Sequence, residues 1–388
     1  MTGIERLKAC VSLQPVDRPG LLTSYTDRLA ALQAGMSYAD IIEQPDAASA
    51  AMRKLWAQLG GYGDAVYYAG GTDIYYLAAK HYTRIRLPGK DLPRDVYWQI
   101  VEKPNFTQEE YDVLINEGWN AFMWRMIPRV WDIPAEELKK CGSVAAYHKA
   151  QSERSLLQYK KDTELWRTMG VEVFVGASVP TPQMVLSCAR SLMDYTMDLY
   201  EIPDKVEKAL WTALPALIEN GIAGCKATGI NCVAIIIERG SGQLYPLDLF
   251  EKFEWPLLKR MVEEFVNNGI TPLLHLDTDW TKNLPYFREF PRGKVVASFD
   301  GTTNLINAKK VLRDHVCIMG DVPASLLVAG TAAEVEAYVR RLCEEVGEGG
   351  GFILGTGCSM PPNADIENVK TLVNVCKSYS PAREREAT

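Results

Sequence analysis

The chain has 388 residues, of which 47% are hydrophobic and 23% charged, and its formal net charge is −7. The apolar fraction is too high for a disordered protein, and the acidic balance argues against a protein that coats nucleic acid or an anionic lipid surface. The sequence has no run of about 18 apolar residues that could span a membrane, and its first residues lack the apolar core of a signal peptide. We therefore expect a cytoplasmic protein with neither nucleic-acid nor membrane partners.

Short apolar runs alternate with longer amphipathic stretches along the chain. The apolar runs predict strands at residues 20–24, 65–69, 171–175, 232–237, 271–275, 294–299, 316–319 and 351–354. Most of them are continuously apolar, as in parallel strands that are covered on both faces. Between them, Asp204-x-x-Glu207 and Thr331-x-x-Glu334 have the spacing of capping boxes that begin helices. This alternation favours an α/β fold of the (β/α)8 TIM-barrel type. An open dinucleotide-binding sheet is disfavoured because no GxGxxG follows the first strand.

We expect residues 1–388 to form a single domain. Two segments of this domain are additional to the strands and helices of a minimal barrel. Residues 1 to about 50 predict an N-terminal helical cap, and residues from about 76 to 165 predict a helical insertion in an early βα loop. The insertion is rich in Trp and Tyr and follows an early strand, on the side where barrel active sites lie. It is either a lid or partner surface, or a packed helical subdomain.

The residues with the clearest chemical pattern end two of the predicted strands. In LLHLDTDW at 273–280, His275 and Asp277 are two residues apart, and residues at i and i+2 of a strand point the same way. In GFILGTGCSMP at 351–361, a glycine-rich turn presents Cys358, one of nine cysteines that form no CxxC pair. Strand ends of a barrel converge on one cavity, and three such ligands with one open position are typical of catalytic zinc. The alternative is a structural histidine and a small core cysteine.

Five segments of the chain resemble the uroporphyrinogen decarboxylase-like superfamily, specifically its corrinoid-dependent methyltransferase branch. They are VDRPG at 16–20, GYGDAVYY at 61–68, YPLDLFEKFEWPLLKRM at 245–261, GDVPASLLVAGTAAEVEAYV at 320–339 and GGFILGTGCSMPPNADIENVKTLV at 350–373. The last is the most specific. The resemblance implies a TIM barrel, and a homodimer is common in the superfamily.

The branch is decided at the site residues. The decarboxylases carry an RQAGRY-like motif, and the matching stretch here, TSYTDRL at 23–29, lacks it. The methyltransferases that load coenzyme M carry an HxC…C zinc pattern, whereas Asp277 stands at the middle position in this chain. A third pattern, E-x14-E-x20-H of the O-demethylase methyltransferases, is nearly matched by Glu238, Glu254 and His275, with one extra residue in the first spacing. Glu238 ends a strand and is a fourth ligand or a general acid. Glu254 is an alternative ligand or a solvated helix carboxylate, so the zinc ligand set stays open.

The resemblance implies a zinc-dependent methyltransferase that moves a methyl group from a methoxylated aromatic compound to the Co(I) corrinoid (cobalamin) of a partner protein. The corrinoid is expected on a partner because the sequence has no D-x-H-x-x-G signature. Tyr25, Tyr245 and Trp280 are candidates for binding the aromatic ring, and Asp300 for a substrate hydroxyl or for support of a metal ligand. The alternatives are a methyl-corrinoid:thiol (coenzyme M-type) or:pterin methyltransferase, a uroporphyrinogen-type decarboxylase, and a non-catalytic barrel that binds a corrinoid protein.

Overall fold

Parallel strands at the centre of the molecule form one sheet in the order β1-β9-β8-β7-β6-β5-β4. The structure is a computed structural model that describes residues 1–380. The strands are β1 (Gly20–Leu21), β4 (Ala177–Pro180), β5 (Cys232–Ile236), β6 (Thr271–Leu276), β7 (Val296–Phe299), β8 (Cys317–Val322) and β9 (Phe352–Thr356). Each strand pairs in parallel with its neighbour, and β1 pairs with β9 at the other end of the chain.

An eighth segment closes this sheet into a ring. The Asp64 amide donates a hydrogen bond to the Leu21 carbonyl, and Val66 bridges in parallel to Val173. Residues 64–67 therefore lie between β1 and the stretch that leads into β4. The expected run at 171–175 makes only this irregular pairing, and the regular strand begins at Ala177. The (β/α)8 barrel predicted from the sequence is confirmed.

Apolar side chains fill the interior of the barrel. They come from every part of the ring and include Leu22, Ala65, Ala234, Leu273, Val296, Met319 and Ile353. Helix α1 (Gly3–Val11) adds Leu7, Cys10 and Val11 to the same cluster, so it covers the amino-terminal end of the barrel. At the carboxyl end, Tyr25 and Tyr68 pack on the cluster.

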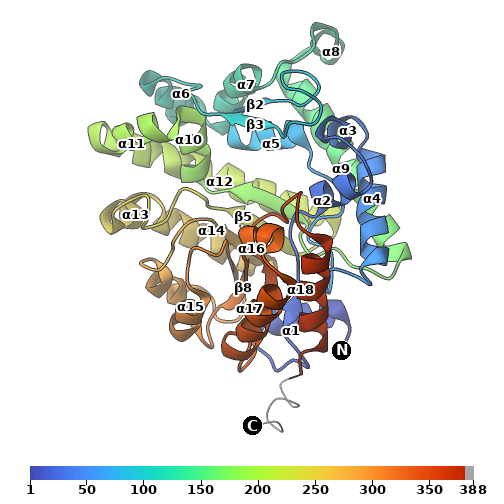
Figure 1. Cartoon of the computed structure of the whole chain (residues 1–388). Coiled ribbons are helices and arrows are strands. Elements are labelled where there is room, and N and C mark those ends of the chain that lie inside the picture. Colours follow the sequence, from blue (N-terminus) through green and yellow to red (C-terminus); the bar gives the residue numbers. More distant parts are fainter. Residues whose placement is uncertain (381–388) are drawn as a thin grey trace.

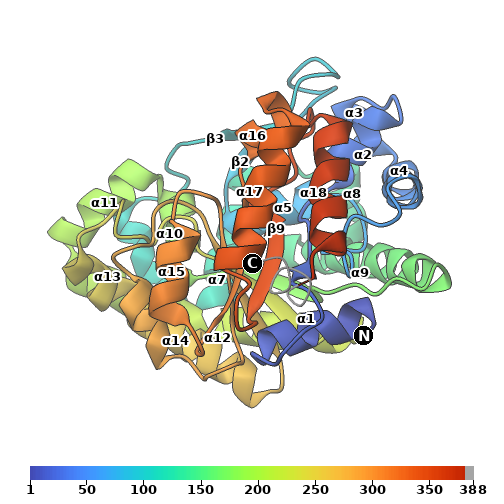
Figure 2. The same ribbon diagram turned by 60° about the horizontal axis from the view of Figure 1, so that its bottom comes forward.

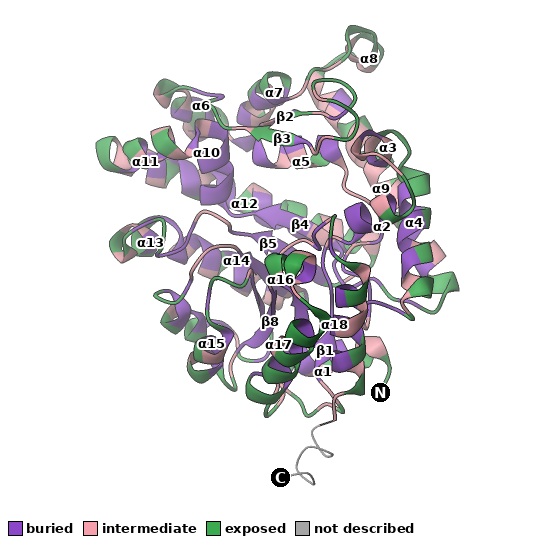
Figure 3. Cartoon of the chain, viewed as in Figure 1, coloured by how far each residue is buried: buried purple, intermediate pink, exposed green. Residues whose placement is uncertain are grey.

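Amphipathic helices cover the outside of the ring, with buried faces inward and exposed faces outward (Figure 3). In α14 (Trp255–Asn267) the buried residues recur at helical spacing, from Leu257 through Met261 to Phe265. The other helices around the ring are α10 (Pro182–Arg190), α11 (Leu192–Glu201), α12 (Pro203–Thr228), α13 (Leu247–Phe253), η2 (Leu284–Glu289), α15 (Leu305–Leu312), α16 (Ala324–Ala329), α17 (Ala332–Glu345) and α18 (Ile366–Ser378). Within residues 1–380, no helix has the length and apolar character needed to cross a membrane.

Two further groups of elements flank the ring. The first 50 residues hold α1, β1, α2 (Asp27–Gln33), α3 (Tyr38–Glu43) and the start of α4 (Pro45–Gln58), so strand β1 interrupts their helices. Between the second barrel segment and β4 lie α5 (Ile74–His81), β2 (Arg84–Arg86), β3 (Gln99–Val101), η1 (Gln108–Glu110), α6 (Tyr111–Glu117), α7 (Trp119–Val130), α8 (Ala135–Cys141) and α9 (Val144–Thr168).

This inserted group lies on the carboxyl side of the barrel. The Tyr76 hydroxyl of α5 donates a 3.1 Å hydrogen bond to the Ser178 carbonyl in β4. The strands β2 and β3 lie at the top and α1 toward the bottom of two different views (Figure 1, Figure 2). The strands β2 and β3 of the insertion therefore lie at the end of the molecule opposite α1, whereas α9 runs back towards the side of α1 (Figure 2).

Candidate metal centre

Three side chains with metal-binding atoms meet at the carboxyl end of the barrel. The ligand atoms of His275, Asp277 and Cys358 all lie within 4.8 Å of one another. The His275 Nε2 atom is 3.5 Å from Asp277 Oδ1 and 3.6 Å from Cys358 Sγ. His275 is buried, and the other two residues are half-buried. Within residues 1–380, this is the one such group of three His, Cys, Asp or Glu side chains.

The strand register explains why distant residues meet. His275 is in β6 and Asp277 follows it, so the two side chains share the inner face of the barrel, as their spacing predicts. Cys358 follows β9, and its carbonyl accepts two hydrogen bonds of 2.7 Å, from Ser24 Oγ after β1 and from Thr356 Oγ1. Residues at the carboxyl ends of β1, β6 and β9 therefore meet at one site.

The loop that carries Asp277 is held from behind. The Trp280 indole N–H donates a 2.8 Å hydrogen bond to the Asp277 carbonyl, and the Thr278 amide donates one of 2.8 Å to Asp300 Oδ2. Thr278 has a φ of 74°, a left-handed conformation that is costly for a β-branched residue. Asp300 therefore supports the loop that carries Asp277. Support of a metal ligand is one of the two roles that the sequence predicts for Asp300.

Of the three aromatic residues expected at the substrate, the structure places one beside the group. The Tyr25 ring is 6.1 Å from the His275 ring. Trp280 is fully buried and packs against Phe287 in the outer core, so it does not face the mouth. Tyr245 is also in the outer core, where its hydroxyl forms a 3.1 Å hydrogen bond with Thr196.

The two expected glutamates lie outside the group of three. Glu238 is half-buried after β5, and burial raises its pKa, with a further contribution from the charge of Asp277. Glu254 is the N-cap residue of α14 and is 1% exposed, and burial raises its pKa to about 8. A hydroxyl, Thr181 Oγ1, donates to it at 3.3 Å. The interpretation of Glu254 as a solvated helix carboxylate is therefore wrong, because α14 turns this side chain into the core.

The charges around His275, Asp277 and Cys358 favour the binding of a cation. Burial disfavours the imidazolium form of His275, but the neighbouring Cys358, Asp277 and Glu238 outweigh it and raise the pKa of His275 to about 9. Burial also raises the pKa of Asp277. Its Oδ1 atom is buried and has no hydrogen-bond partner within residues 1–380. A buried carboxylate oxygen that accepts no hydrogen bond, beside an imidazole and a thiol, is a donor set that fits Zn²⁺.

Three residues near the carboxyl-end opening of the barrel, Tyr67, Tyr68 and Lys80, were not predicted from the sequence as site residues. The buried hydroxyls of Tyr67 and Tyr68 have no hydrogen-bond partner in the described part of the chain, and the Tyr67 and Tyr68 rings lie 5.5 Å and 5.3 Å from Tyr25. Lys80 of α5 donates a 2.6 Å hydrogen bond to Ser178, and burial lowers the pKa of Lys80 to about 8. The tyrosine pair could have been found at the end of a predicted strand. Lys80 could not, because its position depends on how the insertion docks.

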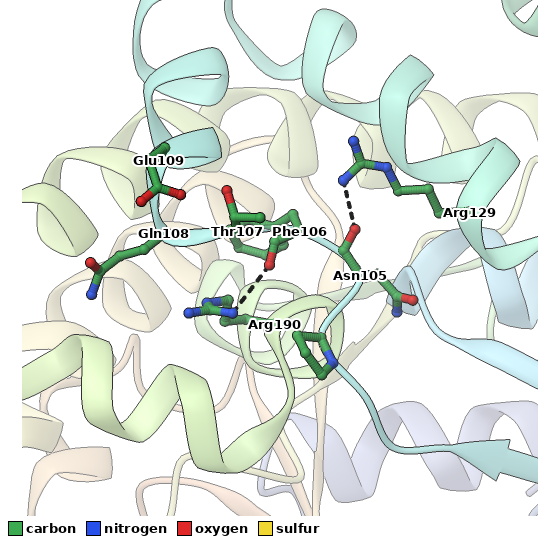
Figure 4. A pocket seen from close by; sticks show the side chains of 8 residues that line it. Asn105, Phe106, Thr107, Gln108, Glu109, Arg129 and Arg190 are labelled. Atoms are coloured by element: carbon green, nitrogen blue, oxygen red, sulfur yellow. Dashed lines mark hydrogen bonds between the residues drawn. The ribbon is translucent and has the colours of Figure 1, made fainter.

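A separate cavity of about 390 Å³ lies between the insertion and α10 (Figure 4). It shares no residue with the group of three. Its two arginines are already engaged, Arg129 by the Asn105 carbonyl at 2.7 Å and Arg190 by the Phe106 carbonyl at 3.2 Å. Both also pair with carboxylates, so the cavity adds nothing to the metal centre.

Comparison with known proteins agrees with this architecture. Residues 141–379, more than half of the chain, match the uroporphyrinogen decarboxylase (URO-D) family. The chain belongs to the uroporphyrinogen decarboxylase family. This confirms the superfamily predicted from the sequence segments, and the matched region of the URO-D family contains β4 through α18 and all three residues of the group.

Two curated relatives have different activities. Over 173 residues, 43% of this chain and 49% of the relative, the chain is 24% identical to the methylcobamide:CoM methyltransferase MtbA of Methanosarcina mazei. Over 174 residues, 44% of this chain and 48% of the relative, it is 24% identical to the uroporphyrinogen decarboxylase of Dichelobacter nodosus. The chain thus spans about half the length of each relative.

A solved structure shares the fold over nearly its whole length. A methyltransferase from Methanosarcina mazei superposes with a TM-score of 0.69, covering 97% of this chain and 98% of that chain at 18% identity. At this identity the likeness establishes the URO-D family fold and not the activity.

Proposed function

We propose that this chain is a zinc-dependent methyltransferase that transfers a methyl group from a methoxylated aromatic compound to the Co(I) corrinoid of a partner protein. The observation that carries the proposal is the group of His275, Asp277 and Cys358, in which the buried Asp277 Oδ1 atom accepts no hydrogen bond from the described residues. The similarity to a methylcobamide:CoM methyltransferase supports corrinoid chemistry in this part of the family.

The donor set suits an oxygen substrate. His275, Asp277 and Cys358 would hold the ion, and a mixed N, O and S set makes a harder Lewis acid than a thiolate-rich one. When bound, zinc supplies a positive charge that stabilises the phenolate leaving group. The oxygen of the donor keeps the electron pair of the broken O–CH3 bond, and the pair of the new C–Co bond comes from Co(I).

Residues around the carboxyl-end opening of the barrel can assist the departure of the phenolate. Glu238 follows β5, and burial raises its pKa, which favours the protonated form that a general acid for the departing phenolate oxygen needs. The Tyr25 ring provides an aromatic wall beside His275. Because α1 covers the opposite end of the barrel, the corrinoid protein would approach from the carboxyl side, where the insertion lies.

A metal analysis combined with a methyl-transfer assay tests the proposal. We expect about one zinc per chain, lost in His275→Ala and Cys358→Ala. Zinc should be retained in the control Cys141→Ala, which removes a half-buried thiol of α8. The wild type should methylate cob(I)alamin from a methoxylated arene, and the two zinc-free variants should not. A metal-free protein with full activity would overturn the proposal.

The relatives favour two other activities that the same preparation can test. A methyl-corrinoid:thiol methyltransferase, as in MtbA, would consume methylcobalamin and coenzyme M. A decarboxylase would release CO2 from uroporphyrinogen without zinc. We expect neither reaction, because Asp277 replaces the second thiolate of the thiol pattern and residues 23–29 lack the arginine motif of the decarboxylases.

A further inference from the structure

Lys80 places a positive charge at the carboxyl-end opening of the barrel. It lies in the last turn of α5, in the insertion, and it is half-buried. Burial lowers its pKa to about 8, so the side chain is still mostly charged at neutral pH. An ammonium has three N–H donors, and within residues 1–380 this one uses a single donor, in the 2.6 Å hydrogen bond to Ser178 Oγ. Lys80 therefore has unused donors for a ligand.

The alternation of side chains along the strands places this ammonium on the inner face of the barrel. In β4, Val179 packs in the core outside the ring, so its neighbour Ser178 points inward. In β6, Leu273 belongs to the cluster inside the ring, and His275 two residues later points the same way. Only β5 separates the two strands in the sheet. Lys80, bonded to Ser178, therefore faces the same opening as His275.

Two tyrosines connect the position of Lys80 with the candidate metal centre. Burial raises the pKa of Tyr68 to about 12, and the nearby hydroxyls of Ser178 and Tyr25 oppose this rise. The Tyr25 ring is 5.3 Å from the Tyr68 ring and 6.1 Å from the His275 ring. The residue that holds Lys80, the two tyrosines and the candidate metal ligand thus form one continuous side of the opening.

Anchoring the insertion is the structural alternative for Lys80, and a neighbouring residue already does this. The Tyr76 hydroxyl, one turn earlier in α5, donates a 3.1 Å hydrogen bond to the Ser178 carbonyl. The helix is therefore tied to β4 without the ammonium. A charge is also an expensive anchor where a neutral hydroxyl suffices, because burial disfavours the charged form.

We propose that Lys80 is a further catalytic residue of the methyl transfer, whose ammonium donates a hydrogen bond to the departing phenolate oxygen. A second positive charge beside a metal ion is unfavourable unless an anion lies between them, and the reaction creates that anion. The oxygen keeps the electron pair of the broken O–CH3 bond, and Co(I) supplies the pair of the new C–Co bond. Lys80 keeps its proton, and Glu238 remains the proposed proton donor. This inference rests on the proposed function and adds a residue to it.

The ionisation of a bound phenol tests the inference without any turnover. The probe is 4-nitrophenol, whose phenolate absorbs at a longer wavelength than the neutral form, bound to the zinc-loaded full chain. Its pKa should be about 1–3 pH units lower in the wild type than in Lys80→Met, because a nearby positive charge favours the phenolate. Lys80→Arg keeps the charge and should keep most of the difference.

Methyl transfer to cob(I)alamin from two donors gives a second test. Lys80→Met should lower kcat about 100-fold with anisole, as removal of one donor to a developing oxyanion does. The loss should be smaller with 4-cyanoanisole, because its ring already stabilises the phenolate. General damage to the structure would slow both donors equally.

A matched control separates this effect from a general loss of positive charge. Lys149→Met removes an exposed lysine of α9 in the same insertion and should match the wild type in both tests. An unchanged pKa of bound 4-nitrophenol in Lys80→Met would overturn the inference. Bound 4-nitrophenol that stays neutral in the wild type, at a pH where the free phenol is ionised, would also overturn it, and this result does not depend on whether a Lys80 variant folds.

The outcomes also distinguish this inference from the proposed function. If the wild type demethylates anisole and Lys80→Met does so equally fast, the methyltransferase proposal stands and the role of Lys80 fails. If Lys80 lowers the pKa of the bound phenol but no methoxylated arene methylates cob(I)alamin, the phenolate site stands and the proposed reaction fails.

Discussion

Replacing Glu254 by glutamine should make the free energy of unfolding less dependent on pH. The carboxyl is 1% exposed, and its Oε1 atom has no hydrogen-bond partner among residues 1–380. Burial raises its pKa from 4.5 to about 8, so the folded protein holds this proton at neutral pH. The unfolded chain releases it near 4.5. Stability from this group is therefore complete below that pH and is lost as the pH rises towards 8.

The size of the effect follows from the two pKa values. A difference of one pKa unit corresponds to about 1.4 kcal/mol, so the free energy that this group contributes to stability should fall by about 3–4 kcal/mol between pH 5 and pH 8. Glutamine has nearly the same shape and no charge, so the variant should lack this slope. Relative to the wild type, the stability of Glu254→Gln should therefore rise by about 3–4 kcal/mol over that pH range.

Urea unfolding at several pH values measures this difference. The control Glu219→Gln removes an exposed carboxylate from α12 and should follow the wild type at every pH. The reasoning is refuted if Glu254→Gln also runs parallel to the wild type. The variant should keep its zinc, because Glu254 lies outside the group of three. Loss of zinc would instead support the ligand set of Glu238, Glu254 and His275.

Three further substitutions test the site and the frame around it. Asp300→Ala removes the acceptor that holds the loop after β6, so zinc affinity should fall about 10- to 100-fold in a competition with a chelating dye, and an unchanged affinity would contradict this. Asp64→Ala removes a carboxylate that lies 2.7 Å from both Arg6 and Arg18, but Arg6 keeps its pair with Asp17, so the free energy of unfolding should fall by about 1–3 kcal/mol in urea titrations. Gly221→Ala places a methyl group 2.7 Å from the Phe265 ring and should cost about 1–3 kcal/mol; a Tm equal to that of the wild type would show that α12 can shift.

The regular strands of the barrel could be predicted because their sequence is continuously apolar. The runs that became β5 and β6 begin at the predicted residues, and Thr331 forms the expected capping box of α17. Asp204 does not form such a box, because α12 begins at Pro203 and Asp204 is the second residue of the helix instead of its N-cap. The expected run at 171–175 ends at Gly176, where a Cβ atom would lie 2.2 Å from the Ile230 carbonyl. This close approach of backbones has no signal in a local hydrophobic pattern.

The candidate site, like the fold, could be predicted from the sequence only in part. The spacing of two between His275 and Asp277 reflects strand periodicity, which sequence displays directly. The burial of the Trp280 side chain could not be predicted in this way, because it depends on contacts with Phe250 and Phe287 from two other elements. An aromatic residue next to a strand end has the same local sequence whether it faces the mouth or the core.

The pairing of β1 with β9 has a consequence for how the molecule is made. Gly20 lies opposite Ile353, so the ring stays open until almost the whole chain has left the ribosome. Cys358 follows this last strand and is held by Ser24 from just after the first. The candidate metal centre can form only once the chain includes Cys358, and a product truncated before β9 would hold at most His275 and Asp277. Metal capture would thus mark the completion of folding, in addition to preparing the site for chemistry.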